Sequence, residues 1–228
     1  MDRPTAQDAL TEEELNRLLA QPSPRYPSGK RHLALLLLLA DAGLRISEAT
    51  ALTTQDLVLE GGQITHVLIR RGKRGQRAKQ PLTLRAAAKL GAWLQGREAL
   101  GLGPGPIFCT ISRGAARGHF ARPGQQLEPG QPISTVYVRQ LVKRLAARAG
   151  LGRNISPHTL RHTAITRYLR ATGNLELTRK FARHANIQTT ARIYAHLVQE
   201  DVDRGVHLLP GSGDYTSRNS EFRIQNSE

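Results

Sequence analysis

The apolar run from Leu33 to Ala40, Leu-Ala-Leu-Leu-Leu-Leu-Leu-Ala, most strongly constrains the fold of this 228-residue chain. Basic side chains and an imidazole at 30–32 precede the run, and Asp41 follows it. It is far shorter than the roughly 20 residues that a helix needs to cross a bilayer. A helix that is apolar on all sides must be covered by other parts of the protein. The run therefore predicts a buried core helix, which we place at about residues 29–42.

Patterns elsewhere in the chain predict further helices and one hairpin. Thr11 followed by Glu14 has the spacing of a capping box and predicts a helix that continues to about residue 20. Partly alternating β-branched residues at 63–69 and a return at 80–84 predict an antiparallel hairpin, whose second strand Pro81 places at a sheet edge. The other expected elements are helices at 46–52, 85–99, 134–147, 157–171, 175–185 and 188–208, and a short strand at 107–109. The predicted fold class is mainly α with a small antiparallel β-sheet (α+β).

Charge is strongly segregated along the chain. The sequence holds 33 Lys plus Arg and 18 Asp plus Glu, a formal net charge of +15. Residues 61–199 carry 24 basic and 3 acidic side chains, whereas residues 1–60 and 200–228 are each slightly acidic. A segment so positive favours a polyanionic partner, and nucleic acid is the expected one because each neutralised phosphate releases a counterion. An anionic membrane is disfavoured, since no basic amphipathic helix carries Trp or Phe on its apolar side.

Composition also argues against metal, disulfide and secretory chemistry. The single cysteine, Cys109, allows neither an intramolecular disulfide nor a cysteine-based zinc cluster. His158 and His162 have a metal-binding spacing, but Thr159 stands where a zincin has its glutamate. The acidic N-terminus lacks a secretory pattern. We therefore expect a cytoplasmic protein, associated with the nucleoid if it is prokaryotic, with no membrane partner, no metal and no other cofactor.

The most informative stretch is residues 156–164, Ser-Pro-His-Thr-Leu-Arg-His-Thr-Ala. Ser156 is suited to an N-cap and Pro157 to the first helical position, so a helix is predicted to begin here. His158 and Arg161 then share one face of its first turn, where backbone N–H groups already favour an anion. The stretch predicts an anion-binding helix end.

Two earlier motifs supply further cations. Gly-Leu-Arg-Ile-Ser-Glu at 43–48 places Arg45 at the start of a helix, with Glu48 three residues on and able to orient it. Gly-Lys-Arg at 72–74 places Lys73 at the tip of the predicted hairpin, where a flexible ammonium group can reach into a cleft.

Two later motifs complete an ordered set. Ala-Arg-His-Ala-Asn-Ile-Gln-Thr-Thr carries His184, and Arg-Ile-Tyr-Ala-His on the next helix carries Tyr194. With the motifs above, in this order, the chain resembles the tyrosine recombinase, or phage integrase, family over about residues 11–209. Two local features depart from the family pattern. Arg183 stands where the family usually has glycine, and Tyr194 follows His184 by ten positions, one more than usual.

The resemblance implies the fold of the tyrosine recombinase catalytic domain and a DNA strand transferase. Such an enzyme cleaves and rejoins duplex DNA through a covalent 3′-phosphotyrosine, without metal or ATP. Tyr194 would be the nucleophile, and its ordinary pKa of about 10 makes phenolate formation cost roughly 4 kcal/mol at pH 7. Lys73 would protonate the departing 5′ oxygen, with Lys79 as the alternative acid. Tyr215 is a remote alternative nucleophile.

The resemblance also implies which residues bind the phosphate. Arg45 and Arg161 would each grip phosphate oxygens bidentately, which an ammonium group cannot do. His158 would bond the phosphate or take the tyrosine proton, and His184 would donate to a phosphate oxygen. Without a metal, these groups must stabilise the charge that develops in the transition state.

Further basic residues are expected to hold the DNA backbone: Arg70, Arg71, Arg74, Arg77, Lys79, Arg139 and Lys143. The partner would be double-stranded DNA, bound by a homotetramer, with possible accessory DNA-binding factors. The expected organisation is an N-terminal extension (1–10), a catalytic domain (11–209) and a flexible tail (210–228), part of which has the look of an artificial addition. Two other functions remain open, a topoisomerase or resolvase using the same residues and an inactive DNA-binding module on the same fold.

Overall fold

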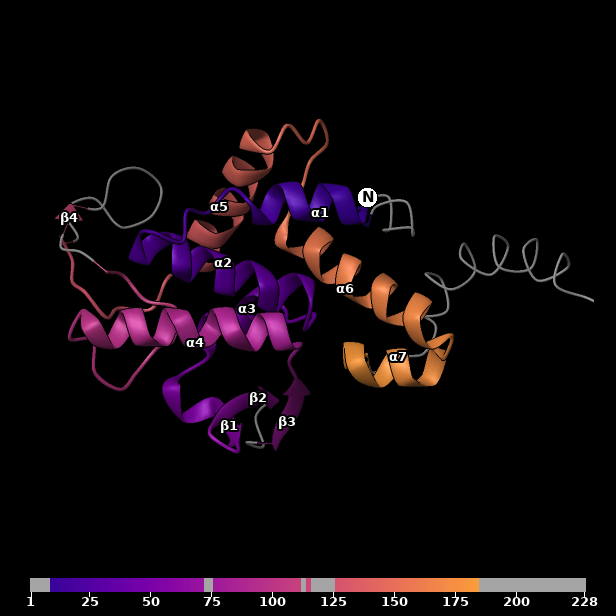
Figure 1. Cartoon of the computed structure of the whole chain (residues 1–228), viewed down its shortest axis with the longest axis horizontal. Coiled ribbons are helices and arrows are strands. Elements are labelled where there is room, and N and C mark those ends of the chain that lie inside the picture. The colour runs from indigo at the N-terminus through magenta and orange to yellow at the C-terminus, as the bar shows by residue number, and fades with distance from the viewer. Residues whose placement is uncertain (1–8, 72–75, 112–113, 116–125, 185–228) are drawn as a thin grey trace, which may run out of the picture.

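The computed structural model describes residues 9–71, 76–111, 114–115 and 126–184. Its helices are α1 (Glu12–Leu19), α2 (Pro27–Ala40), α3 (Ile46–Ala51), α4 (Leu84–Ala99), α5 (Thr135–Arg148), α6 (Pro157–Thr172) and α7 (Leu175–Ala182), with a 3-10 turn, η2 (Thr54–Asp56). Its strands are β1 (Leu57–Glu60), β2 (Gln63–Arg71), β3 (Gln76–Pro81), β4 (Gly114–Ala115) and β5 (Gln126–Leu127). The three-stranded sheet lies at one end of the molecule and α1 and α5 at the other, with α2 and α4 between them (Figure 1). The predicted fold class is confirmed.

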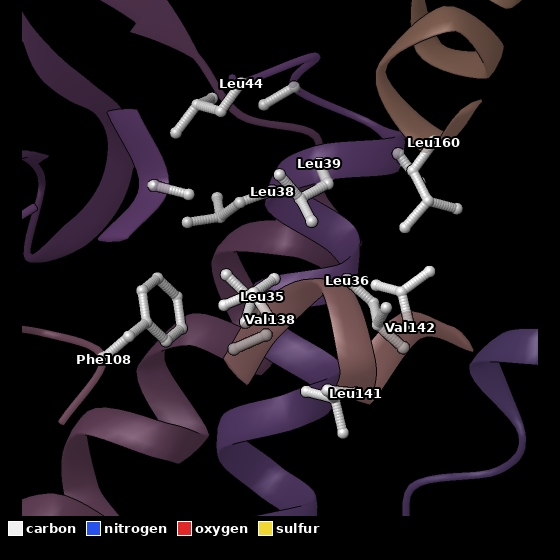
Figure 2. Close-up of a cluster of buried hydrophobic side chains, with 14 of the residues drawn as sticks. Leu35, Leu36, Leu38, Leu39, Leu44, Phe108, Val138, Leu141, Val142 and Leu160 are labelled. Atoms are coloured by element: carbon white, nitrogen blue, oxygen red, sulfur yellow. The ribbon is translucent and has the colours of Figure 1, made fainter. Parts of the chain in front are cut away.

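Helix α2 is the central element, as its apolar run predicted. Every residue from Ala34 to Ala40 is buried, and the helix contacts α1, α3, α4 and α6. Its leucines meet Phe108 and the apolar faces of α5 and α6 in one core (Figure 2). Burial of each leucine contributes about 2 kcal/mol. The core therefore fixes α6, which carries two predicted catalytic residues, against α2.

The sheet is antiparallel in the order β1-β2-β3, and a tight turn joins its first two strands. Gly61 and Gly62 form that turn with φ values of 57° and 77°, which glycine adopts without steric cost. Strand β3 is at the edge, as Pro81 predicted, and His66 is paired with Pro81. The prediction was wrong on its limits, because β3 spans 76–81 rather than 80–84. Thr83, within the predicted strand, instead caps α4 by accepting from the Ala86 amide.

Local capping sets where the helices near the site begin and end. The predicted caps of α1 and α6 are confirmed: the Thr11 and Ser156 hydroxyl groups accept from amides three residues on, and Pro157 occupies the first turn of α6. Gly173, with φ 59°, ends α6 in a left-handed conformation. Helix α7 then lies beside α6, since Tyr168 stacks on Phe181 with ring centroids 4.3 Å apart. The end of α7 is thereby placed within reach of Arg161 in the first half of α6, whose side chain donates to the Ala182 oxygen.

The remaining predictions have mixed outcomes. The strand expected at 107–109 is replaced by two isolated bridges, Thr53 to Pro106 and Cys109 to Pro132. The helix expected at 188–208 lies outside the described residues. Among the described helices, none is both long and apolar enough to span a bilayer.

Candidate active site

Four of the predicted catalytic residues lie on three elements that meet at one place. Arg45 is the N-cap residue of α3, His158 and Arg161 lie in the first turns of α6, and His184 follows α7. The two arginines are close enough to both histidines to act on their charge. After desolvation, the positive charges of Arg161 and Arg45 are the main causes that lower the pKa of His158 and of His184. The other two, Lys73 and Tyr194, lie outside the described residues, as does Tyr215.

Arg161 is a buried cation held by backbone carbonyl groups. Its Nη1 donates to the Gly43 oxygen and its Nη2 to the Ala182 oxygen, so it ties the turn before α3 to the end of α7. Glu48 is the nearest carboxylate, with Oε2 3.9 Å from Nη1. Burial, then the positive charges of Arg45 and Arg183, lower the pKa of Arg161 to about 9. The guanidinium remains charged at neutral pH and keeps further N–H donors for an anion.

Arg45 is positioned by Glu48, the i, i+3 contact that the sequence predicted. The Arg45 backbone N–H donates to Glu48 Oε2 at 2.7 Å, and its Nη1 donates to Oε1 at 2.8 Å. The Arg45 side chain is 44% exposed, whereas that of Glu48 is only 14% exposed. Burial raises the pKa of Glu48, but Arg183 and Arg45 outweigh it and hold that pKa below its ordinary value. A carboxylate that is ionised at neutral pH thus orients an accessible guanidinium.

The two imidazoles are neutral at physiological pH. Desolvation, Arg161 and Arg45 lower the pKa of His158 below its ordinary value. The same causes, together with Arg183 and His158, lower the pKa of His184 to about 4. A neutral imidazole has one donor and one acceptor nitrogen, so it can donate to a phosphate oxygen or accept a proton.

Arg183 belongs to this cluster, although sequence reasoning noted it only as a departure from the family's glycine. Its Nη2 donates to Glu48 Oε2 at 2.6 Å and to the Gly43 oxygen at 3.3 Å, and its Nη1 donates to Gln80 Oε1. The substitution itself could have indicated this role, because a charged side chain in place of the usual glycine needs a hydrogen-bonding or oppositely charged partner. That partner lies 135 positions away, beyond the reach of local patterns.

The predicted DNA-binding residues are spread over the sheet and α5. Arg70 is exposed near Asp56, and Lys79, the alternative acid, donates to Glu60 at 3.0 Å. Arg139 and Lys143 are exposed on α5. Arg71 pairs with Gln76 and Arg70 with Arg77 in the β2–β3 register, and Arg74 lies outside the described residues.

No group of three or more His, Cys, Asp or Glu residues is placed to hold a metal ion in the described part of the chain.

Comparison with known proteins identifies the family. Residues 8–201 match the model of the phage integrase family. The chain belongs to the phage integrase family. It is 34% identical to a tyrosine recombinase of Synechococcus elongatus over 80% of this chain and 52% of that protein. It is also 34% identical to tyrosine recombinase XerC of Xanthomonas campestris over 82% of this chain and 51% of that protein.

Solved structures show the same fold for this integrase-family chain. The XerA recombinase matches with a TM-score of 0.69 and 24% identity, over 91% of this chain and 66% of that chain. XerH bound to its palindromic difH substrate matches with a TM-score of 0.67 and 24% identity, over 91% and 54%. The catalytic domain of bacteriophage HP1 integrase matches at 0.53 and 18%, over 90% and 96%. The chain spans about half the length of the curated relatives named above.

Gly43 supplies a carbonyl acceptor for Arg161 and Arg183, and we predict that Gly43→Ala destabilises the protein. Gly43 has φ 60°, which costs a residue with a Cβ about 1–2 kcal/mol. The added Cβ would also lie 3.3 Å from Phe181 Cε1 and 3.5 Å from Ala164 Cβ. We expect the free energy of unfolding to fall by about 2–3 kcal/mol in urea titrations.

The matched control is Gly61→Ala, which has a similar φ of 57° but no atom within 4 Å of the added Cβ. It should lose only the backbone part of that free energy. Equal losses in the two variants would contradict the close contact with Phe181.

Proposed function

We propose that this family member is a site-specific recombinase or integrase that cleaves and rejoins duplex DNA through a covalent 3′-phosphotyrosine. The observation that carries the proposal is the convergence of Arg45, His158, Arg161 and His184 beside the start of α6. Three guanidinium groups there, counting Arg183, share the single carboxylate of Glu48. Such an excess of positive charge suits an anionic transition state.

In the proposed reaction, Arg45 and Arg161 bind the non-bridging oxygens of the scissile phosphate. They offset the negative charge that grows as phosphorus becomes five-coordinate, and bidentate guanidinium contacts also fix its orientation. His184 donates a hydrogen bond to a phosphate oxygen, and His158 bonds the phosphate or accepts the tyrosine proton. The low pKa of each imidazole keeps it in the neutral form that can do either.

Tyr194 is the proposed nucleophile and Lys73 the proposed acid. The Tyr194 hydroxyl gives its proton to His158, or to solvent if His158 instead bonds the phosphate, and its oxygen forms a bond to phosphorus. The bond from phosphorus to the 5′ oxygen breaks at the same time, and Lys73 gives the departing 5′ oxygen a proton. The phosphodiester energy is kept in the phosphotyrosine. Attack by a 5′ hydroxyl then reverses the steps, so rejoining consumes no ATP.

Assembly on DNA is part of the same proposal. Strand exchange needs cleavage at several phosphates, which favours a homotetramer on double-stranded DNA, with or without accessory DNA-binding factors. XerH and the Tn1549 transposon integrase have been solved in complex with DNA, which supports DNA as the partner of this chain as well. Integration, excision and resolution share this chemistry.

A suicide substrate tests the nucleophile. The full chain would be incubated with a pool of nicked duplexes with randomised binding arms, in which the freed fragment diffuses away and rejoining is blocked. The wild-type protein should give a covalent protein–DNA band on a denaturing gel. Tyr194→Phe should give none, because phenylalanine has no oxygen with which to attack.

Tyr215→Phe is the matched control and should retain the band. A band that survives Tyr194→Phe but disappears in Tyr215→Phe would move the nucleophile to Tyr215. Salt-dependent DNA binding by the wild type without any band would favour the inactive DNA-binding module.

A further inference from the structure

Arg183 has an unusual backbone for its residue type. Its φ and ψ are 54° and 41°, the left-handed conformation, and it is the sole non-glycine residue with positive φ in the described part of the chain. Its Cβ makes this conformation unfavourable. Glycine, usual in the family at this position, would adopt it freely. The arginine is therefore retained against a steric preference, which calls for a compensating role.

The guanidinium of Arg183 joins three separate segments. Its side chain is only 3% exposed. It donates to Glu48 on α3, to the carbonyl of Gly43 before α3, and to the side chain of Gln80 on β3. Gln80 in turn donates to the Ala42 oxygen at 3.0 Å. The end of α7, just before His184, is thus fastened to the sheet and to the turn that leads into α3.

Glu48 is the link from Arg183 to the accessible arginine. Its Oε2 accepts from Arg183 and from the backbone of Arg45, while its Oε1 accepts from the guanidinium of Arg45. An exposed i, i+3 ion pair alone holds a side chain weakly. A third, buried partner restricts the carboxylate and therefore restricts the guanidinium that it orients.

We propose that Arg183 is a positioning residue, which fixes Glu48 so that Arg45 is held in the orientation that binds the scissile phosphate. Because the Arg183 side chain is buried, it acts on cleavage through Glu48 and Arg45 and does not itself bind DNA. The inference rests on the proposed function, because Arg45 needs an exact orientation only if it contacts a reacting phosphate.

The test separates cleavage from binding in two variants. Arg183→Met keeps the bulk and removes the donors, and Arg183→Gly also relieves the backbone. The substrate is one suicide duplex, selected from the randomised pool by its covalent complex with the wild-type protein. For each folded variant, the single-turnover cleavage rate at a saturating concentration of this duplex should fall about 100-fold, the size expected when a catalytic group is misplaced by about 1 Å. The Kd for the same duplex should stay within about twofold of wild type, because Arg183 is too buried to touch DNA.

Lys180→Met is the matched control for the lost charge. Lys180 lies on the same helix with its side chain 66% exposed, so its removal should leave the saturated cleavage rate unchanged. A double-variant cycle tests whether Arg183 acts through Arg45. In an Arg45→Ala background, the further change Arg183→Gly should slow cleavage little, since the group being positioned is already gone.

The outcomes distinguish this inference from the function on which it rests. A wild-type protein that forms no covalent complex would overturn the proposed function. Wild-type cleavage together with an equally fast Arg183→Gly would overturn only the positioning role. Additive rate losses in the Arg45→Ala background, or loss of folded protein in both Arg183 variants, would also overturn it, because Arg183 would then act independently of Arg45 or serve stability alone.

Discussion

Replacing Arg161 by alanine is expected to slow DNA cleavage by about a thousandfold, while DNA binding persists and keeps its salt dependence. Arg161 is a charged group at the centre of the cluster, and removing one preorganised donor to a developing anion typically costs about 100- to 1,000-fold in rate. Non-specific affinity depends instead on many exposed cations along the DNA backbone. The buried Arg161 contributes little to that sum.

The same substitution acts on stability in two opposing ways. It removes donors from the Gly43 and Ala182 carbonyl groups, which costs roughly 1–3 kcal/mol for each one left unsatisfied. It also removes a buried cation whose charge is disfavoured by burial and by the positive charges of Arg45 and Arg183, which together lower the pKa of Arg161. We therefore expect a net loss of about 2 kcal/mol, small enough for the variant to be assayed folded.

Single-turnover cleavage of a suicide duplex and fluorescence anisotropy at several salt concentrations would measure the two effects. Arg170→Ala is the matched control, because Arg170 lies exposed on the same helix and carries the same charge. It should keep the cleavage rate. Loss of DNA binding in Arg161→Ala, with cleavage reduced only in proportion, would contradict a catalytic role.

Much of the fold could be predicted because its signals are local. The apolar run of α2, the capping box at Thr11 and the start of α6 at Ser156 each depend on neighbouring residues, and each is found where it was expected. Strand β1 was missed because its four residues are ordered by pairing with β2 rather than by their own pattern. The limits of β3 were wrong for a related reason, since its basic residues give no alternating signal.

In the candidate site, too, contacts between neighbouring residues could be predicted from the sequence, whereas contacts between distant segments could not. The contact between Arg45 and Glu48 is three residues apart and was anticipated from spacing. The burial of Arg161 between Gly43 and Ala182 was not, because packing of α2 against α6 brings the Gly43 carbonyl there and packing of α7 against α6 brings the Ala182 carbonyl. The same packing gives Arg183 its partner. Local motifs therefore indicate which side chains carry charge, and tertiary packing decides which of them share a carboxylate.

The Asp41 carboxylate holds together several of the helices around the site. At the end of α2, its Oδ1 accepts from Arg85 at 2.5 Å and from Arg167 at 2.9 Å, and its Oδ2 accepts from Arg85 and Thr83. Its side chain is fully buried. It therefore joins α2 to the start of α4 and to α6, two residues before Gly43.

Asp41→Asn should lower the free energy of unfolding by about 3–5 kcal/mol. The substitution leaves two guanidinium groups around a neutral amide, and breaking a buried ion pair from one side costs about that much. The midpoint of thermal unfolding should fall by about 10 °C for a chain of this size. Glu176→Gln is the control, since it breaks an exposed pair with Arg179 and should shift the midpoint very little.

The stabilisation by Asp41 should be lost in acid. Burial raises the pKa of Asp41, but hydrogen bonds and charge from Arg85, with Thr83 and Arg167, outweigh it and hold that pKa below its ordinary value. A carboxyl whose pKa is lower in the folded than in the unfolded state contributes stability above the unfolded pKa of about 3.9, and that contribution is lost as pH falls through the folded pKa. The difference in unfolding midpoint between wild type and Asp41→Asn should thus be constant from pH 6 to 8 and shrink in acid. A difference that grew in acid would mean that Asp41 is protonated in the folded protein, and α2, α4 and α6 would then be held together by packing alone.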